Sequence, residues 1–173
     1  MAIDDCKHTF EELANVRLPE YMRALREKLK DPIPMRHFSV KGEGPSTIAK
    51  NLGLSVQDGK LKGCYVLVEK GRPVYVGISQ DVLSRLTNHV KGKTHNESTL
   101  AYKIAAGAPR HDMPRDEAMN DSDFQREFEK AKDQIKNMNV AFIEIENDLE
   151  LHIFEAYCSM ELNTSKLNSF RTH

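Results

Sequence analysis

The sequence predicts an α/β fold of the α+β kind, in which helices flank a small, mainly antiparallel sheet of three strands. Two short apolar runs, residues 63–69 and 74–78, are separated by the turn sequence Lys-Gly-Arg-Pro and therefore predict a hairpin. Residues 139–147 alternate apolar and polar side chains, which is typical of a third strand. Helical patterns surround these strands, so the order of elements favours a sheet with helices packed on it.

The helices are predicted from their caps and apolar periods. Thr9 and Glu12 form a candidate capping box at the start of one broken helix, or two short ones, reaching residue 31. This region carries one apolar stripe: Leu18, Tyr21, Met22, Leu25 and Leu29. Further helices are predicted at residues 46–52, 81–91, 99–106, 124–138 and 148–160, and a long polar loop at 107–123. We therefore expect a helical N-terminal extension, residues 1–60, followed by a domain of residues 61–173.

Composition limits the classes to which the chain can belong. Its 173 residues, 39% of them hydrophobic, suit one globular domain with a small appendage. No apolar run approaches the roughly 18 residues of a membrane span, and no signal-peptide pattern is visible. The three cysteines have neither disulfide nor metal-site spacing. We expect a cytoplasmic protein without a membrane partner.

The charge is unevenly distributed although the net charge is only -1. Residues 60–110 hold nine Lys and Arg against three acidic residues, whereas residues 111–150 hold five against twelve. A locally basic segment is what binding to a polyanion requires, although a surface whose charges cancel locally explains the same pattern.

Four polar side chains and one glycine stand out around the predicted hairpin. Tyr65 and Tyr75 lie on adjacent strands, and Gly77 adds little bulk where the second strand ends. Arg85 and His89 follow on one face of the next helix, because they are four residues apart. Arginine stabilises phosphoryl charge through two parallel hydrogen bonds, and a phenol becomes a useful base only with help from a cation. The set therefore points to phosphodiester hydrolysis.

These residues resemble the motifs of the GIY-YIG nuclease family. The first motif corresponds to Gly63-Cys64-Tyr65 and the second to Tyr75-Val76-Gly77. The remaining family positions match, in order, Arg85, His89, Glu155 and Asn168. The resemblance covers about residues 63–170, and it implies a metal-dependent DNA endonuclease or nickase that uses Mg²⁺ or Mn²⁺.

The resemblance also implies catalytic roles for single residues. Arg85 would stabilise charge on the phosphoryl group, and Glu155 would hold the single divalent metal. Tyr75 is favoured as the general base with Tyr65 as its neighbour, although either tyrosine could instead orient the water. His89 would hydrogen-bond a tyrosine or a phosphate oxygen.

Three further residues would support the site or the nucleic acid: Gly77, His95 and Asn168. His95 lies in a loop beside the proposed site, and Asn168 would steady the local structure or the DNA backbone. Two residues compete with these assignments, because Glu150 shares a helix with Glu155 and Asn163 precedes Asn168 by five positions.

Two other functions remain open at this point. The chain could be a catalytically weak or inactive nucleic-acid-binding module on the same fold, which would explain its near-neutral net charge. Alternatively, the apolar stripe of the N-terminal helices could dock a partner protein or a second copy in a homodimer.

Overall fold

The computed structural model describes residues 3–55, 60–107 and 114–170. Contacts between residues divide the chain into two compact units. Unit 1 comprises Met1–Ile33, Val56–Val82 and Asn139–His173, and unit 2 comprises Pro34–Ser55 and Leu83–Met138. These units are defined by contacts alone and do not test the domain boundary expected near residue 60. That boundary stays a prediction.

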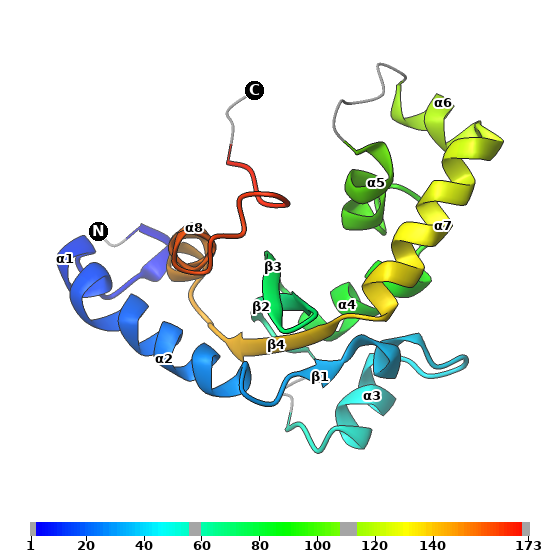
Figure 1. Cartoon of the computed structure of the whole chain (residues 1–173). Helices are drawn as coiled ribbons and strands as arrows, with labels where there is room; N and C mark the ends of the chain where they lie inside the picture. The colour runs from blue at the N-terminus through cyan, green and yellow to red at the C-terminus, as the bar shows by residue number, and fades with distance from the viewer. Residues whose placement is uncertain (1–2, 56–59, 108–113, 171–173) are drawn as a thin grey trace. The chain divides into compact units, whose positions relative to one another are not determined.

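The sheet confirms the α+β class but has four strands (Figure 1). Their order is β1-β4-β2-β3, with β1 at Ile33–Pro34, β2 at Gly63–Glu69, β3 at Arg72–Ser79 and β4 at Asn139–Glu144. β2 pairs antiparallel with both β3 and β4. The prediction of three strands was wrong because β1 has only two residues, one of them proline, and so shows no alternating pattern.

The β2–β3 hairpin closes through a two-residue loop. Glu69 pairs with Arg72, and the loop residues Lys70 and Gly71 have φ angles of 49° and 77°. Two positive φ angles in succession define a type I′ turn, whose twist matches that of the flanking strands. The turn predicted from Lys-Gly-Arg-Pro is therefore confirmed, and Arg72 opens β3 directly after it.

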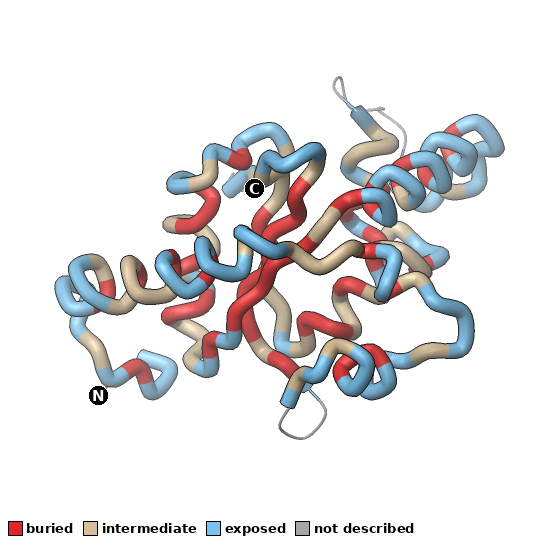
Figure 2. Tube along the Cα trace, turned by 60° about the horizontal axis from the view of Figure 1, so that its bottom comes forward, coloured by how far each residue is buried: buried red, intermediate tan, exposed pale blue. Residues whose placement is uncertain are grey.

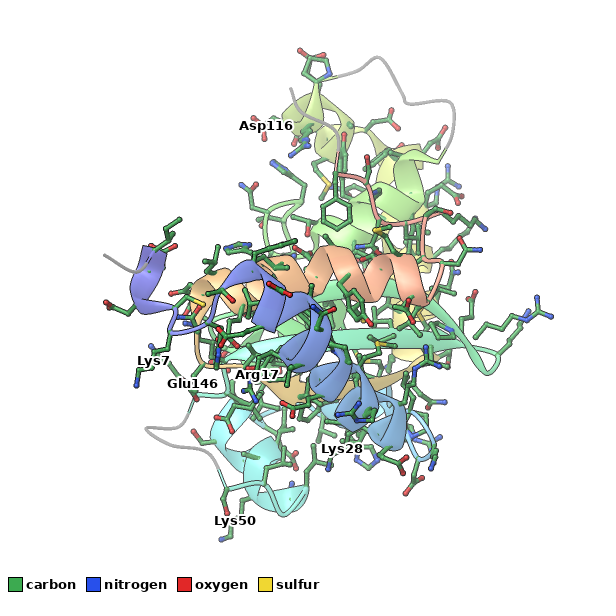
Figure 3. All side chains as sticks on the ribbon, turned by 90° about the vertical axis from the view of Figure 1, so that its left-hand side faces the viewer. Lys7, Arg17, Lys28, Lys50, Asp116 and Glu146 are labelled. Carbon is green, nitrogen blue, oxygen red and sulfur yellow. The ribbon has the colours of Figure 1, made fainter. Side chains whose placement is uncertain are left out.

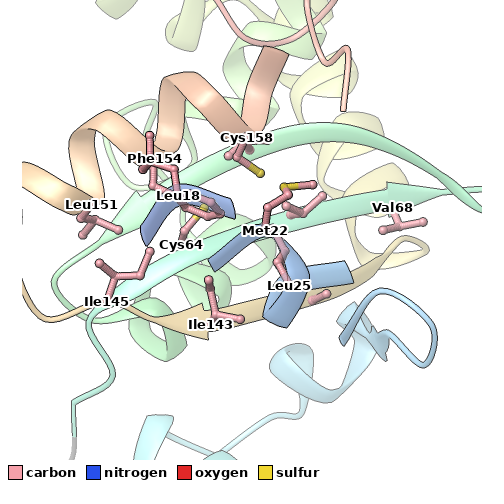
Figure 4. Close-up of a cluster of buried hydrophobic side chains, with 13 residues drawn as sticks. Leu18, Met22, Leu25, Cys64, Val68, Ile143, Ile145, Leu151, Phe154 and Cys158 are labelled. Carbon is pink, nitrogen blue, oxygen red and sulfur yellow. The ribbon is translucent and has the colours of Figure 1, made fainter. Parts of the chain in front are cut away.

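One face of the sheet is covered by two helices, α2 (Leu18–Lys28) and α8 (Asp148–Glu161), which lie on the same side of β2 and β3 (Figure 1). We call it the helix-covered face. Its buried core, drawn in Figure 4, contains Leu18, Met22, Leu25, Cys64, Val66, Val68, Val76, Ala141, Ile143, Ile145, Leu151, Phe154 and Cys158. Burial of these apolar side chains is the main driving force for assembly of unit 1.

The apolar stripe of the N-terminal helices is confirmed, and it is part of this core. Leu18, Met22 and Leu25 are at most 4% exposed. The stripe is therefore not an exposed docking surface. A partner bound through the N-terminal helices stays a prediction, and it would have to use other side chains, such as the exposed Phe10 and Val16.

The chain before α2 contains the predicted cap. Thr9 and Glu12 form the capping box of α1, Phe10–Glu12. A short 3₁₀ helix, η1 at Ile3–Asp5, precedes α1, and a π-helical turn, η2 at Leu13–Arg17, joins α1 to α2. Figure 3 labels Arg17 where this turn enters α2.

Unit 2 is helical. Its elements are η3 (Met35–Ser39), α3 (Pro45–Asn51), α5 (Thr99–Ala106), α6 (Arg115–Asn120), α7 (Ser122–Lys136) and most of α4 (Val82–Lys91). α5, α6 and η3 all pack on α7, which buries four side chains at helical spacing: Phe124, Phe128, Ala131 and Ile135.

The predicted loop at residues 107–123 was wrong where α6 forms. This helix buries only Ala118 among six residues, so it lacks the apolar period from which a helix is predicted. Residues 108–113 of the predicted loop lie outside the described part of the chain.

Buried positions concentrate along the strands, as Figure 2 shows, and six of the seven residues of β2 are buried. Within the described ranges, no helix is both long enough and apolar enough to cross a membrane.

Candidate active site

The two predicted tyrosines lie together on one face of the sheet. Tyr65 pairs with Gly77 across the hairpin and Tyr75 pairs with Leu67, so all four residues share the face opposite Cys64 and Val66. We call this the tyrosine face. The ring centroids of Tyr65 and Tyr75 are 6.2 Å apart, with planes inclined by 51°.

The two phenols differ in their contact with solvent. Tyr65 is 1% exposed, whereas Tyr75 is half-buried. Only Tyr75 therefore combines a position on this face with partial access for water, which fits the role assigned to it from the sequence.

Gly77 makes room for the Tyr65 ring. A Cβ atom at this position would lie 2.4 Å from both Cζ and the hydroxyl oxygen of Tyr65. These distances are far below van der Waals contact, so any larger residue would displace the ring. The glycine of the second motif thus supports the position of the first tyrosine.

Glu155 lies on α8, on the other side of the sheet. Its charge contributes to raising the pKa of the Cys64 thiol, which burial raises most and Cys158 raises further. Cys64 points to the helix-covered face because Tyr65, its neighbour in β2, points to the tyrosine face. α8, which carries Glu155, packs on the helix-covered face through Leu151, Phe154 and Cys158, and the two tyrosines lie on the opposite face.

The carboxyl of Glu155 is half-buried, and burial raises its pKa above the ordinary value, opposed by His152. Among the described residues it makes no hydrogen bond or ion pair. A lone carboxylate of this kind has the oxygen donors that Mg²⁺ uses, because that ion keeps several waters and needs only one or two protein carboxylates.

Glu150, the competing glutamate, serves a structural purpose. It is 5% exposed and accepts a 2.6 Å hydrogen bond from the hydroxyl of Tyr21. Burial, and then this carboxylate, raise the pKa of Tyr21 to about 12. Five residues along a helix place Glu150 and Glu155 about 140° apart around the axis, so the two carboxylates face different surroundings.

Asn168 binds the outer edge of the hairpin. Its side-chain oxygen accepts a hydrogen bond from the backbone N–H of Val76 at 2.9 Å, and its amide group donates one to the Val76 carbonyl at 2.7 Å. Val76 lies between Tyr75 and Gly77, so this side chain holds the edge strand at the second motif. Asn168 therefore steadies the local structure, which is one of the two roles expected for it. Its contact with the DNA backbone stays a prediction.

Asn163, the competitor of Asn168, ends α8 instead. Its φ angle is 51°, in the left-handed region that asparagine tolerates better than most residues. The two asparagines have the same side chain, but only Asn168 is placed to bind Val76, whereas Asn163 follows the end of α8.

Arg85 belongs to unit 2, where it binds the start of α5. Its guanidinium donates to the Glu97 carbonyl at 3.1 Å and to the Thr99 hydroxyl at 2.5 Å. A guanidinium has five N–H donors, so these two bonds orient the group without using all of them. The sequence did not indicate Glu97 or Thr99, because the contact depends on how the loop before α5 folds back.

His89 is completely buried in its helix α4. Burial, and then the charge of Arg85, lower its pKa to about 3, so the imidazole is neutral at physiological pH. The hydrogen bond expected from His89 to a tyrosine or to a phosphate oxygen stays a prediction.

His95 is held by side chains of unit 2. Its Nδ1 lies 3.7 Å from an Asp116 carboxylate oxygen, and its ring lies 5.9 Å from that of Tyr102. The contact with DNA expected for His95 stays a prediction.

The structure therefore brings Tyr65, Tyr75 and Gly77 together, packs α8, the helix of Glu155, on the helix-covered face, and sets Arg85 and His89 in unit 2. In the described ranges, no group of three or more His, Cys, Asp or Glu side chains is arranged to hold a metal ion. Comparison with known proteins found no matching family model, curated protein or solved structure.

Proposed function

We propose that the protein is a metal-dependent DNA endonuclease or nickase that hydrolyses phosphodiester bonds with Mg²⁺ or Mn²⁺. The observation that carries the proposal is the pair of phenols on one sheet face, Tyr65 and Tyr75. Gly77 leaves room there for the Tyr65 ring. The ordered motifs around these residues, which resemble those of GIY-YIG nucleases, motivate the choice of substrate.

Each residue has one part in the proposed reaction. Tyr75 orients the attacking water or accepts its proton, and Tyr65 supports the Tyr75 ring. Arg85 offers its remaining donors to the phosphoryl oxygens, where negative charge develops. Glu155 holds the metal through its carboxylate; when bound, the ion supplies positive charge that stabilises the leaving oxygen.

The proposal is tested by cleavage of plasmid DNA by the purified protein with Mg²⁺, with Mn²⁺ and with a chelator. Wild type is expected to nick or cut only with metal, and Glu155→Ala and Arg85→Ala are expected to lose this activity. Glu161→Ala, which removes an exposed carboxylate from the same helix, should retain it. Cleavage in the chelator, or by both Glu155→Ala and Arg85→Ala at the wild-type rate, would contradict the proposal.

The second candidate is a nucleic-acid-binding module that does not cleave. The packing of α8, the helix of Glu155, on the helix-covered face favours it, because the tyrosines lie on the other face. This candidate predicts DNA binding that weakens steeply with salt, because phosphate contacts release counterions. It also predicts intact plasmid under every metal condition, and wild-type cleavage would exclude it.

A further inference from the structure

The hairpin contains a β-bulge close to the tyrosines. Tyr75 pairs with Leu67, but the next residue of β2, Val68, pairs with Pro73. Val74 is therefore an extra residue in β3, without a counterpart in β2. A bulge of this kind commonly changes the direction in which the following side chains point.

The bulge places Arg72 on the tyrosine face. In a regular strand, residues 72 and 75 would point to opposite faces, because three positions separate them. With Val74 inserted, Arg72 pairs with Glu69, and Glu69 shares its face with Leu67 and hence with Tyr75. Sequence alternation alone assigns Arg72 to the wrong side of the sheet.

Arg72 is also available and well positioned. It is exposed, and among the described residues its side chain makes no hydrogen bond or ion pair. The type I′ turn formed by Lys70 and Gly71 defines the backbone directly before it. Its side chain therefore projects from an ordered position and not from a long loop.

The spacing suits a nucleic-acid backbone. Glu69 and Leu67, the partners of Arg72 and Tyr75, are two residues apart, or about 7 Å along β2. A DNA strand winds around the helix axis, so its successive phosphates lie farther apart than their rise of about 3.4 Å along that axis, and about 7 Å is close to the separation of neighbouring phosphates. A guanidinium binds phosphate oxygens through parallel N–H donors.

We propose that Arg72 binds the DNA phosphate next to the one at Tyr75, and so positions the strand along β3 at the accessible part of the tyrosine face. The inference rests on the proposed function, because it takes the tyrosine face as the place where DNA lies. It assigns Arg72 to substrate binding and gives it no part in the chemical step.

The experiment measures DNA binding in chelator, where cleavage is absent, over a series of salt concentrations. Arg72→Ala is expected to weaken binding about tenfold, which corresponds to one charge-assisted hydrogen bond. The slope of log K against log salt should fall by about one. Arg72→Lys should keep the slope and recover part of the affinity, because it retains the charge without the planar fork.

The matched control is Arg23→Ala, an exposed arginine on α2, which covers the opposite face. It removes the same charge and should change neither affinity nor slope. Unaltered binding by Arg72→Ala overturns the inference, as does an equal loss in Arg23→Ala, which would indicate a general effect of net charge. A wild-type protein that does not bind DNA overturns it too.

The binding result separates this inference from the proposed nuclease activity. If wild type binds DNA but never cleaves it, the nuclease proposal fails while the Arg72 comparison still decides the inference. If wild type cleaves and Arg72→Ala binds normally, only the inference fails.

Discussion

The two faces of the sheet in unit 1 are built differently. The helix-covered face receives apolar side chains from α2 and α8, and its residues Cys64, Val66 and Val76 are completely buried. The tyrosine face instead carries two aromatic rings with hydroxyl groups, a glycine that admits one of them and a bulge that turns Arg72 toward them. The first face is packed with apolar side chains, whereas the second combines buried apolar residues such as Leu67 and Phe142 with polar groups in defined positions.

Because the two faces differ, we expect substitutions on one to affect the fold and substitutions on the other to affect the site. On the helix-covered face, stability depends on volume and close packing. On the tyrosine face, it depends on the room left for a ring and on the edge contacts that hold β3 in register. Four substitutions test this contrast.

The largest effect is expected from Phe154→Ala on the helix-covered face. Phe154 is completely buried, and its removal should lower the free energy of unfolding by about 3–5 kcal/mol through lost burial and the cavity left behind. Urea denaturation measures the change. Phe170→Ala, at a position 57% exposed, is the control and should cost less than about 0.5 kcal/mol. Equal effects at the two positions would contradict the assignment of this core.

A smaller effect is expected from Gly77→Ala on the tyrosine face. The new methyl group meets the Tyr65 ring, and such overpacking typically costs about 1–3 kcal/mol. Because the clash needs both partners, Gly77→Ala should cost less in a Tyr65→Ala background than in wild type. Additive effects in this double-mutant cycle, measured by urea denaturation, would show that the ring does not occupy this space.

Asn168→Ala should destabilise the edge of β3 by about 1–2 kcal/mol, because it removes two hydrogen bonds to the Val76 backbone. Amide hydrogen exchange at Val76 should accelerate. Asn168→Asp keeps the acceptor but loses the donor, so we expect a similar loss. Ser165→Ala, in the same exposed tail, controls for nonspecific effects. Unchanged exchange at Val76 in Asn168→Ala would argue against these two hydrogen bonds.

The smallest effect is expected from Glu155→Gln, and it should depend on pH. Burial raises the pKa of Glu155 above its unfolded value, so the folded state favours the protonated carboxyl. The stability contributed by this carboxyl is present below the unfolded pKa and is lost as pH rises through the folded pKa. The variant, which stays neutral, should therefore become the more stable protein at neutral pH.

Thermal unfolding of both proteins between about pH 4 and pH 8 measures this crossover. Glu11→Gln, at an exposed position in α1, is the matched control. A wild-type advantage that grows with pH would mean that the ionised carboxylate is stabilised in the fold, contrary to the cause given for its pKa.

Local patterns in the sequence predicted most of the elements. The capping box at Thr9, the apolar stripe through Leu18 and Leu25, and the strands around the Lys-Gly-Arg-Pro turn all formed as expected. These features depend on residues within a few positions of one another, so their periodicity and turn chemistry are visible in the chain itself. The nearness of the Tyr65 and Tyr75 rings followed from the same hairpin.

Residues close together in the chain thus specified the hairpin, most of the helices and the nearness of the two tyrosines. Three other features depend on the tertiary structure: the fourth strand, the binding of Asn168 to Val76, and the face of the sheet on which α8 packs. Tertiary structure also decided the direction of Arg72, since one unpaired residue reverses the alternation. The physical reason is that register, strand edges and helix packing depend on residues distant in sequence, whereas turns and periods depend only on neighbours.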